Sequence, residues 1–264
     1  MSLGAAIGGD LPSSQITGIG FYVTTPAGAP VVRLDSLEVT PYFLPGPPSI
    51  PPGAAALGYT TCVYDEQPTA ADIAPLPDST GNYKWFRGTS WSTADPPASR
   101  FTTTNGVLTI LRTAEGGGSL VGTPHDFSEG ALPTLPGEDG FYIEFDVRLS
   151  DNHSDHWPAV WLMPVEHNLA LDDVYPGDPA NYERWMELDV DEGGFGPGSL
   201  ASIISWQGIW TGSGYPAPQI YNSYNLAQST SLDRTQVHSY GASYDPIASR
   251  VTWWLDGVQY FTAD

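Results

Sequence analysis

Short stretches of alternating apolar and polar residues recur along this chain, and turn-forming residues separate them. The clearest is 141–149 (FYIEFDVRL), in which apolar side chains occupy every second position. Another, 107–110 (VLTI), directly follows the dipeptide Asn105-Gly106. Alternation with a period of two is typical of strands, and Asn-Gly is typical of tight turns. No long apolar stripe with the helical period competes with these stretches, so the pattern predicts an all-β fold.

An acidic stretch, 185–192 (WMELDVDE), also alternates. As a regular strand it places Trp185, Glu187 and Asp189 on one face and Glu192 on the other. A single β-bulge after Asp189 would return Glu192 to the first face. Three carboxylates on one face repel one another, so the pattern indicates a metal site or a pair of carboxyls whose pKa values a third group separates. A solvated acidic turn is the alternative interpretation.

Length and charge limit the possible domain organisation and the kinds of partner that the chain can bind. The 264 residues suffice for one large all-β domain or two small domains, and Cys62, the single cysteine, cannot form an internal disulfide. The net charge of −21 arises because bases are scarce, with Lys84 the only lysine. Such a surface repels nucleic acid and anionic membranes and favours a neutral substrate. No apolar run reaches the 18 residues of a membrane span, so no membrane partner is expected.

The spacing Glu187-x-Asp189-x-x-Glu192 resembles the signature of glycoside hydrolase family 16, in the bulged form of laminarinase-like and agarase-like members. Residues 157–164 (WPAVWLMP) are similar to the family's WPAFWLLP. The resemblance implies a β-jelly-roll sandwich of two antiparallel sheets with a concave substrate cleft. It also implies that Glu187 is the nucleophile and Glu192 the general acid/base, while Asp189 holds a hydrogen bond to the nucleophile.

The activity that this resemblance implies is retaining endo-hydrolysis of a neutral β-glucan, above all a β-1,3-glucan of laminarin type. No cofactor is required for catalysis, and the enzyme is expected to be a secreted monomer whose signal peptide is not present in this chain. Two alternatives stay open. One is a non-catalytic glucan-binding module on the same fold, and the other is an endo-hydrolase of agarose or mixed-linkage glucan.

The resemblance further implies which residues contact the sugar and a metal. A tryptophan ring can stack on the apolar face of a sugar ring, and Trp185 shares its strand face with Glu187. The expected substrate contacts are Trp157, Trp161, Trp185, Trp206, Gln207, Trp210 and His238. For His238, a buried hydrogen-bonded histidine is the alternative. A structural Ca²⁺ is implied at Glu66 and Asp35, whose carboxylates are hard oxygen ligands, although both can equally be solvated.

The order of the family-like segments is rotated. Residues 1–42 resemble the family's C-terminal strands, with the last strand at 31–42, and 43–58 form a Pro- and Gly-rich linker. Residues 59–264 resemble the N-terminal and catalytic part, which opens with a strand at 61–66. The sequence therefore predicts a single catalytic domain, 1–264, in circularly permuted order. The alternative is an unrelated N-terminal extension on a truncated domain.

Overall fold

A computed structural model describes most of the chain beyond residue 48. The described residues are 49–63, 65–74, 83–87, 96–111, 120–121, 135, 137–153, 158–164, 175–193, 200–209, 219–225 and 232–264. Of Trp185, Trp206, 120–121 and 219–225 only the backbone is described. The predicted strand at 31–42 and the rotated order of the domain depend on residues 1–42, which lie outside this set, so both stay predictions.

Strands dominate the described residues. In chain order they are β1 (Phe86–Arg87), β2 (Phe101–Thr104), β3 (Val107–Ile110), β4 (Leu120–Val121), β5 (Phe141–Val147), β6 (Ala159–Leu162), β7 (Tyr182–Glu192), β8 (Leu200–Ile209), β9 (Gln219–Asn225), β10 (His238–Asp245), β11 (Arg250–Leu255) and β12 (Val258–Ala263). The helical elements are α1 (Pro52–Ala56) and 3₁₀ turns at Ala70–Asp72, Ala98–Arg100 and Gly137–Asp139. In the part of the chain that is described, no helix has the length and apolar character needed to cross a membrane.

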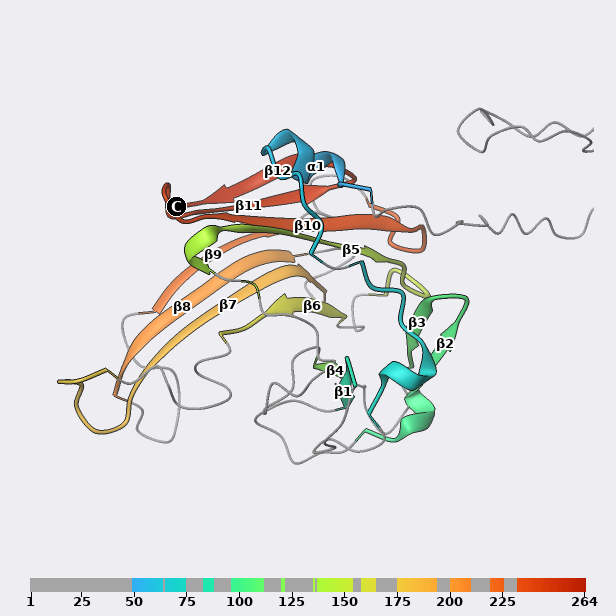
Figure 1. Ribbon diagram of the computed structural model, residues 1–264, viewed down its shortest axis with the longest axis horizontal. Coiled ribbons are helices and arrows are strands. Elements are labelled where there is room, and N and C mark those ends of the chain that lie inside the picture. Colours follow the sequence, from blue (N-terminus) through green and yellow to red (C-terminus); the bar gives the residue numbers. More distant parts are fainter. Residues whose placement is uncertain are drawn as a thin grey trace, which may run out of the picture. The chain divides into compact units, whose positions relative to one another are not determined.

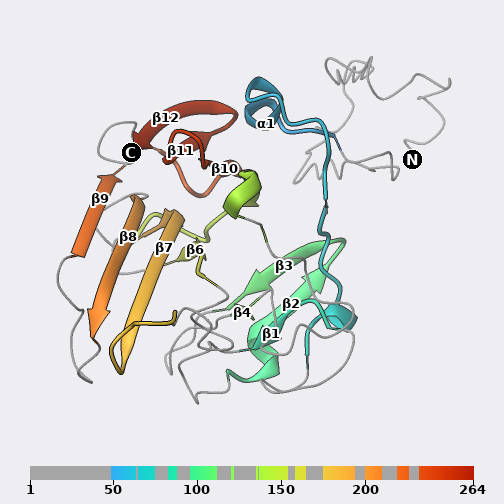
Figure 2. The ribbon, with the colours of Figure 1, turned by 60° about the vertical axis from the view of Figure 1, so that its left-hand side comes forward.

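Two four-stranded antiparallel sheets form the body of residues 45–264 (Figure 1). The first, called here the β10 sheet, has the order β12-β11-β10-β5. The second, called the β7 sheet, has the order β6-β7-β8-β9, and its long strands β7 and β8 are visibly curved. Two smaller sheets, β1-β4 and β2-β3, lie beside one another in the turned view (Figure 2).

Apolar side chains from both large sheets meet in one core. Leu188 and Val190 of β7 pack with Tyr240 of β10 and Trp253 of β11, and all four are buried. The alternation of each strand therefore directs one face toward the other sheet, as packing of two sheets requires. The predicted all-β sandwich of two antiparallel sheets is confirmed.

The predicted turn at Asn105-Gly106 and the strand that follows it are also confirmed. Asn105 and Gly106 join β2 to β3 with φ angles of 50° and 76°. Positive φ at both central residues is the geometry of the tight hairpin turn that Asn-Gly favours. Asp256 and Gly257 make the corresponding turn between β11 and β12, with φ angles of 48° and 75°. The predicted strand within 141–149 forms as β5.

The stretch at 61–66 differs from the prediction, since its described residues form no strand and Val63 is 71% exposed. A strand needs a hydrogen-bonded neighbouring strand, and the described residues supply none for this stretch.

Within the predicted linker, 43–58, the structure adds an element that the Pro- and Gly-rich composition did not foretell. Pro52 begins α1, a position that proline tolerates because the first N–H groups of a helix lack partners. Gly53 of α1 is buried beneath Tyr142 of β5, and α1 lies over the outer face of the β10 sheet (Figure 1). The hydroxyl of Tyr142 also lies over Gly241 of β10.

Candidate active site

Strand β7 contains the bulge that its sequence predicts. Asp189 lies opposite Ser202 of β8, but the next paired residue, Glu192, lies opposite Leu200. Three steps on β7 therefore match two steps on β8. The pairing with β6 shifts at the same point, where Asp189 faces Trp161 and Glu192 faces Ala159. One extra residue is thus inserted into β7 relative to both neighbours, which is the definition of a β-bulge.

The bulge decides which side chains share a face. Val190 and Asp191, consecutive in the chain, are both fully buried and both belong to the side that faces the β10 sheet. Glu192 then returns to the side of Asp189, because their partners on β6 and β8 are two residues apart. Glu187 lies two residues before Asp189 on that same side. The three predicted carboxylates therefore share one face of the β7 sheet.

Asp189 is the buried member of this trio, with 1% of its surface exposed. Its carboxylate accepts a hydrogen bond from the Ser202 hydroxyl on the paired strand. The pKa of Asp189 is raised to about 7, mainly by burial and further by the negative charges of Glu192 and Glu187, against the opposing effect of the Ser202 hydrogen bond. Below neutral pH the carboxyl of Asp189 therefore carries a proton between two other carboxyl groups.

A tryptophan of the opposite sheet holds the backbone of the same residue. The indole Nε1–H of Trp253 donates a 2.8 Å hydrogen bond to the carbonyl of Asp189, and Trp253 is fully buried. A bulge interrupts the regular ladder, so a carbonyl beside it needs another partner. Nothing in the sequence around Trp253 indicates this contact.

An ion pair lies on the buried side of the bulge. The Nη2 of Arg234 is 2.7 Å from Oδ2 of Asp191, and their side chains are 4% and 0% exposed. The main chain of Arg234 is tied to the segment after β5: its N–H donates to the Asn152 side chain at 2.9 Å, and its carbonyl accepts from the Leu149 N–H at 2.9 Å. Sequence reasoning missed Arg234 altogether, and no pattern around it could have revealed the contact.

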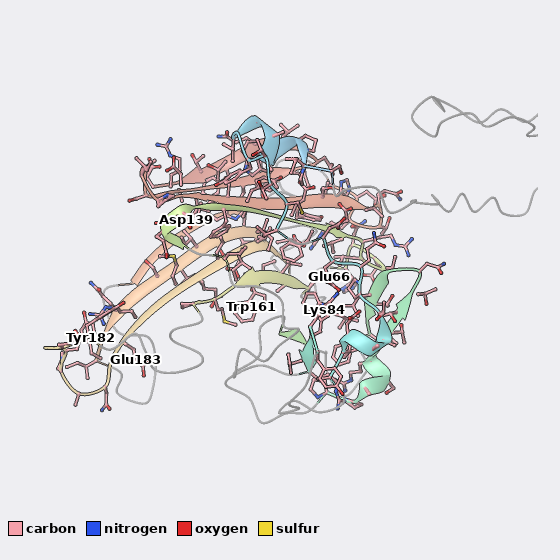
Figure 3. The ribbon with its side chains drawn as sticks, viewed as in Figure 1. Glu66, Lys84, Asp139, Trp161, Tyr182 and Glu183 are labelled. Carbon is pink, nitrogen blue, oxygen red and sulfur yellow. The ribbon has the colours of Figure 1, made fainter. Side chains whose placement is uncertain are left out.

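Of the predicted sugar-binding tryptophans, only Trp161 has a described side chain. Trp161 of β6 is half-buried opposite Asp189, and its ring lies on the side of β6 away from the β10 sheet (Figure 3). The backbone positions of Trp185 and Trp206 face one another across β7 and β8, two residues from Glu187, while their side chains are not described. Trp157 and Trp210 lie outside the described residues.

Gln207 and His238 are not brought to the carboxylates. Gln207 pairs with Arg184, which lies an odd number of residues, three, before Glu187. Strand alternation therefore turns the Gln207 side chain to the opposite face of the sheet. Trp206 and Gln207 are consecutive in β8, so the two positions belong to opposite faces of the sheet. His238 is on the β10 sheet, where its ring nitrogens lie 2.9 Å from Asp256 and 3.1 Å from the Asp233 carbonyl. These contacts match the hydrogen-bonded alternative, and a substrate contact of His238 stays a prediction.

The proposed calcium ligands, Glu66 and Asp35, are distant in sequence from the three carboxylates of β7, and only Glu66 is among the described residues. Both carboxylate oxygens of Glu66 bind the ammonium group of Lys84, at 2.9 and 3.2 Å (Figure 3). Asp35 lies outside the described residues. Among the residues whose side chains are described, no group of three or more acidic, histidine or cysteine side chains could hold a metal ion. The calcium site therefore stays a prediction.

No protein-family model and no curated protein matches this chain. Among solved structures, it is similar to the laminarinase catalytic domain from Thermotoga maritima MSB8, with 19% identity over 62% of this chain and 59% of that one and a TM-score of 0.36. For the endo-1,3-beta-glucanase from Streptomyces sioyaensis the identity is 20%, the coverage 73% of both chains and the TM-score 0.42. For a glycoside hydrolase family 16 endo-glucanase from Bacteroides ovatus the values are 18%, 68% and 72%, and 0.39.

This chain thus spans less than two thirds of the length of the Thermotoga domain. The descriptions of these structures name the group of enzymes that the motifs of the chain resemble. With identities of 18–20% and TM-scores of 0.36–0.42, these likenesses carry no argument about activity. Any inference about activity must come from the residues of β7.

Proposed function

We propose that this chain is a retaining endo-β-glycanase that hydrolyses a neutral β-glucan, with β-1,3-glucan as the first candidate. The observation that carries the proposal is the register of β7, which turns Glu192 to the side of Glu187 and Asp189. Retaining hydrolysis requires a nucleophilic carboxylate and a proton-donating carboxyl about 5–5.5 Å apart on one surface. A strand with one bulge can present two such groups side by side.

The reaction has two steps. In the first, the Glu187 carboxylate attacks the anomeric carbon while the Glu192 carboxyl gives its proton to the glycosidic oxygen, so the bond to the leaving sugar breaks. The product is a glycosyl ester of Glu187. In the second, the Glu192 carboxylate takes a proton from water, the water oxygen attacks the anomeric carbon, and Glu187 is released. Two inversions leave the configuration of the sugar retained.

Asp189 is suited to assist the nucleophile. With a pKa of about 7, its carboxyl is protonated in mildly acidic solution and can donate a hydrogen bond. Donation to the Glu187 carboxylate would stabilise the negative charge before attack and lessen the repulsion among three acidic groups. The Ser202 hydroxyl binds one oxygen of Asp189 and leaves the other for this donation.

The surroundings favour a neutral polymer. A net charge of −21 repels sulfated or acidic polysaccharides, whereas Trp161 beside the carboxylates offers a ring for stacking on sugar. We further propose that the enzyme is a monomer and that it is secreted, since polysaccharides of this kind are too large to enter cells.

The decisive experiment measures reducing-sugar release from laminarin, lichenan and agarose by the wild-type chain and by Glu187→Ala. The substitution should abolish turnover of whichever glucan the wild type cleaves, and added azide should restore cleavage and give a glycosyl azide of inverted configuration. Glu192→Ala should slow polysaccharide cleavage more than that of a dinitrophenyl β-glycoside, whose leaving group needs no proton.

The matched control is Glu183→Gln, which removes a carboxylate from β7 four residues before Glu187 (Figure 3). It should keep wild-type turnover. Wild-type activity in Glu187→Ala would refute the mechanism, and binding of glucan without any cleavage by the wild type would favour the non-catalytic module instead. If only agarose is cleaved, the substrate is agarose and not a β-glucan, but the proposed roles of the carboxylates still hold.

A further inference from the structure

The acidic residue inside the bulge is unexplained by the chemistry proposed above. Asp191 directly precedes Glu192, yet it faces the interior and is fully buried. An ionised carboxylate in a protein core is strongly unfavourable unless a positive partner and hydrogen bonds compensate it. Its partner is the equally buried Arg234, with 2.7 Å between Nη2 and Oδ2.

The guanidinium of Arg234 touches both neighbours of Glu192. Beyond Asp191 on one side, its Nη1 lies only 2.9 Å from the place that a Cβ on Gly193 would occupy. The Pro158 ring lies closer still to that Cβ place, at 2.7 Å, so the ring and the guanidinium together leave room only for glycine. The Gly193 N–H donates to the Pro158 carbonyl at 2.9 Å. Because Asn152 and Leu149 fix the main chain of Arg234, the guanidinium is anchored to the segment after β5.

The pair also discriminates between two registers of β7. Without the bulge, alternation would bring Asp191 to the face of Glu187 and turn Glu192 into the core, because a slip of one residue reverses every face. In that register Arg234 would lose its bond to Asp191. In the bulged register the shorter Asp191 pairs with Arg234 at 2.7 Å and the longer Glu192 reaches the substrate side, so the observed pair fits that register.

We propose that Asp191 and Arg234 are positioning residues that hold the bulge of β7 and thereby fix the Glu192 side chain for proton transfer. This inference rests on the proposed function of Glu192. It predicts that loss of the pair weakens the acid/base step selectively, because a displacement of about 1 Å in a catalytic group can lower a rate about 100-fold.

The test uses the double variant Asp191→Leu/Arg234→Met, which removes both charges and keeps apolar volume, a change that buried ion pairs often tolerate without loss of stability. The kcat/KM for laminarin should fall by about 10- to 100-fold. The kcat/KM for a dinitrophenyl β-glucoside reports only the first step, whose leaving group needs no proton, and should fall by less than about threefold. The control Val251→Ala opens the core at β11 and should lower the Tm without changing the ratio of the two rates.

Amide hydrogen exchange gives a readout that needs no activity. In the double variant the Gly193 N–H should exchange faster relative to that of Leu188, whereas in Val251→Ala the two should change together. If the double variant does not fold, Arg234→Lys retains the charge but loses the planar group beneath Gly193, and it should show both effects in weaker form.

A folded variant with wild-type rate ratio and wild-type Gly193 exchange would overturn the inference while leaving the glycanase function in place. If instead the wild type cleaves no glucan, the proposed function fails, and the exchange measurement still decides whether the pair holds the bulge.

Discussion

The substitution Asp189→Asn should make the protein less sensitive to alkaline pH. The pKa of Asp189 in the folded chain is raised from 3.8 to about 7, mainly by burial. Because the folded pKa exceeds the unfolded one, the folded state binds more protons than the unfolded state between these values. The favourable contribution is therefore complete below about pH 4 and is lost as the pH rises through about 7.

The size of this loss follows from the same two values. Each pKa unit corresponds to about 1.4 kcal/mol, so raising the pKa from 3.8 to about 7 costs the ionised folded state about 4 kcal/mol at pH values above neutrality. Asparagine is neutral at every pH and fits the same space, so the variant lacks this cost. The net charge of −21 adds a pH dependence of its own, but it is nearly the same in both proteins and cancels in their difference.

Urea unfolding at about pH 5 and about pH 8 measures the effect. The variant should gain stability relative to the wild type between the two conditions, by about 3 kcal/mol, because part of the full cost is already present at about pH 5. The control is Asp264→Asn, whose exposed carboxyl has its pKa lowered by Arg250, so its effect should not differ between the two conditions. A difference between Asp189→Asn and the wild type that stays constant from acid to alkali would refute the argument.

Three further outcomes are expected. Trp253→Phe removes the indole donor to the buried Asp189 carbonyl and should lower the free energy of unfolding by about 1–3 kcal/mol in urea titrations. If Glu66 binds calcium, chelator should lower the Tm of the wild type and leave Glu66→Gln unchanged, whereas a melt that ignores chelator in both speaks against the site. Removal of residues 1–42 should unfold the chain if they are the displaced end of the domain, and a soluble, active 43–264 fragment would contradict the permutation.

Local pattern was sufficient to predict the strands and the bulge. Alternation located β5 and β7, and the spacing of Asp189 and Glu192 required one inserted residue if both were to share a face, which the register of β7 now bears out. Contacts between distant segments were beyond reach. Arg234 lies 43 residues after its partner Asp191, and nothing in its neighbourhood marks it as buried.

Two differences between the sequence predictions and the structure have the same origin. Gln207 was grouped with its neighbours because they are consecutive, although a strand shows only alternate residues to one side. The helix α1 was missed because proline and glycine were taken as evidence of a linker, while burial of Gly53 depends on a ring supplied by β5.

That ring has a practical meaning for anyone who wishes to recombine this protein. The Tyr142 hydroxyl lies 2.6 Å from the Cβ positions of both Gly53 and Gly241, so neither glycine can acquire a side chain unless the ring moves. The segment that begins at Pro52 is thereby packed closely against the β10 sheet through the Tyr142 ring. An insertion into the segment 43–58 should therefore lie before Ile50, because a junction placed later would separate Gly53 from the Tyr142 ring.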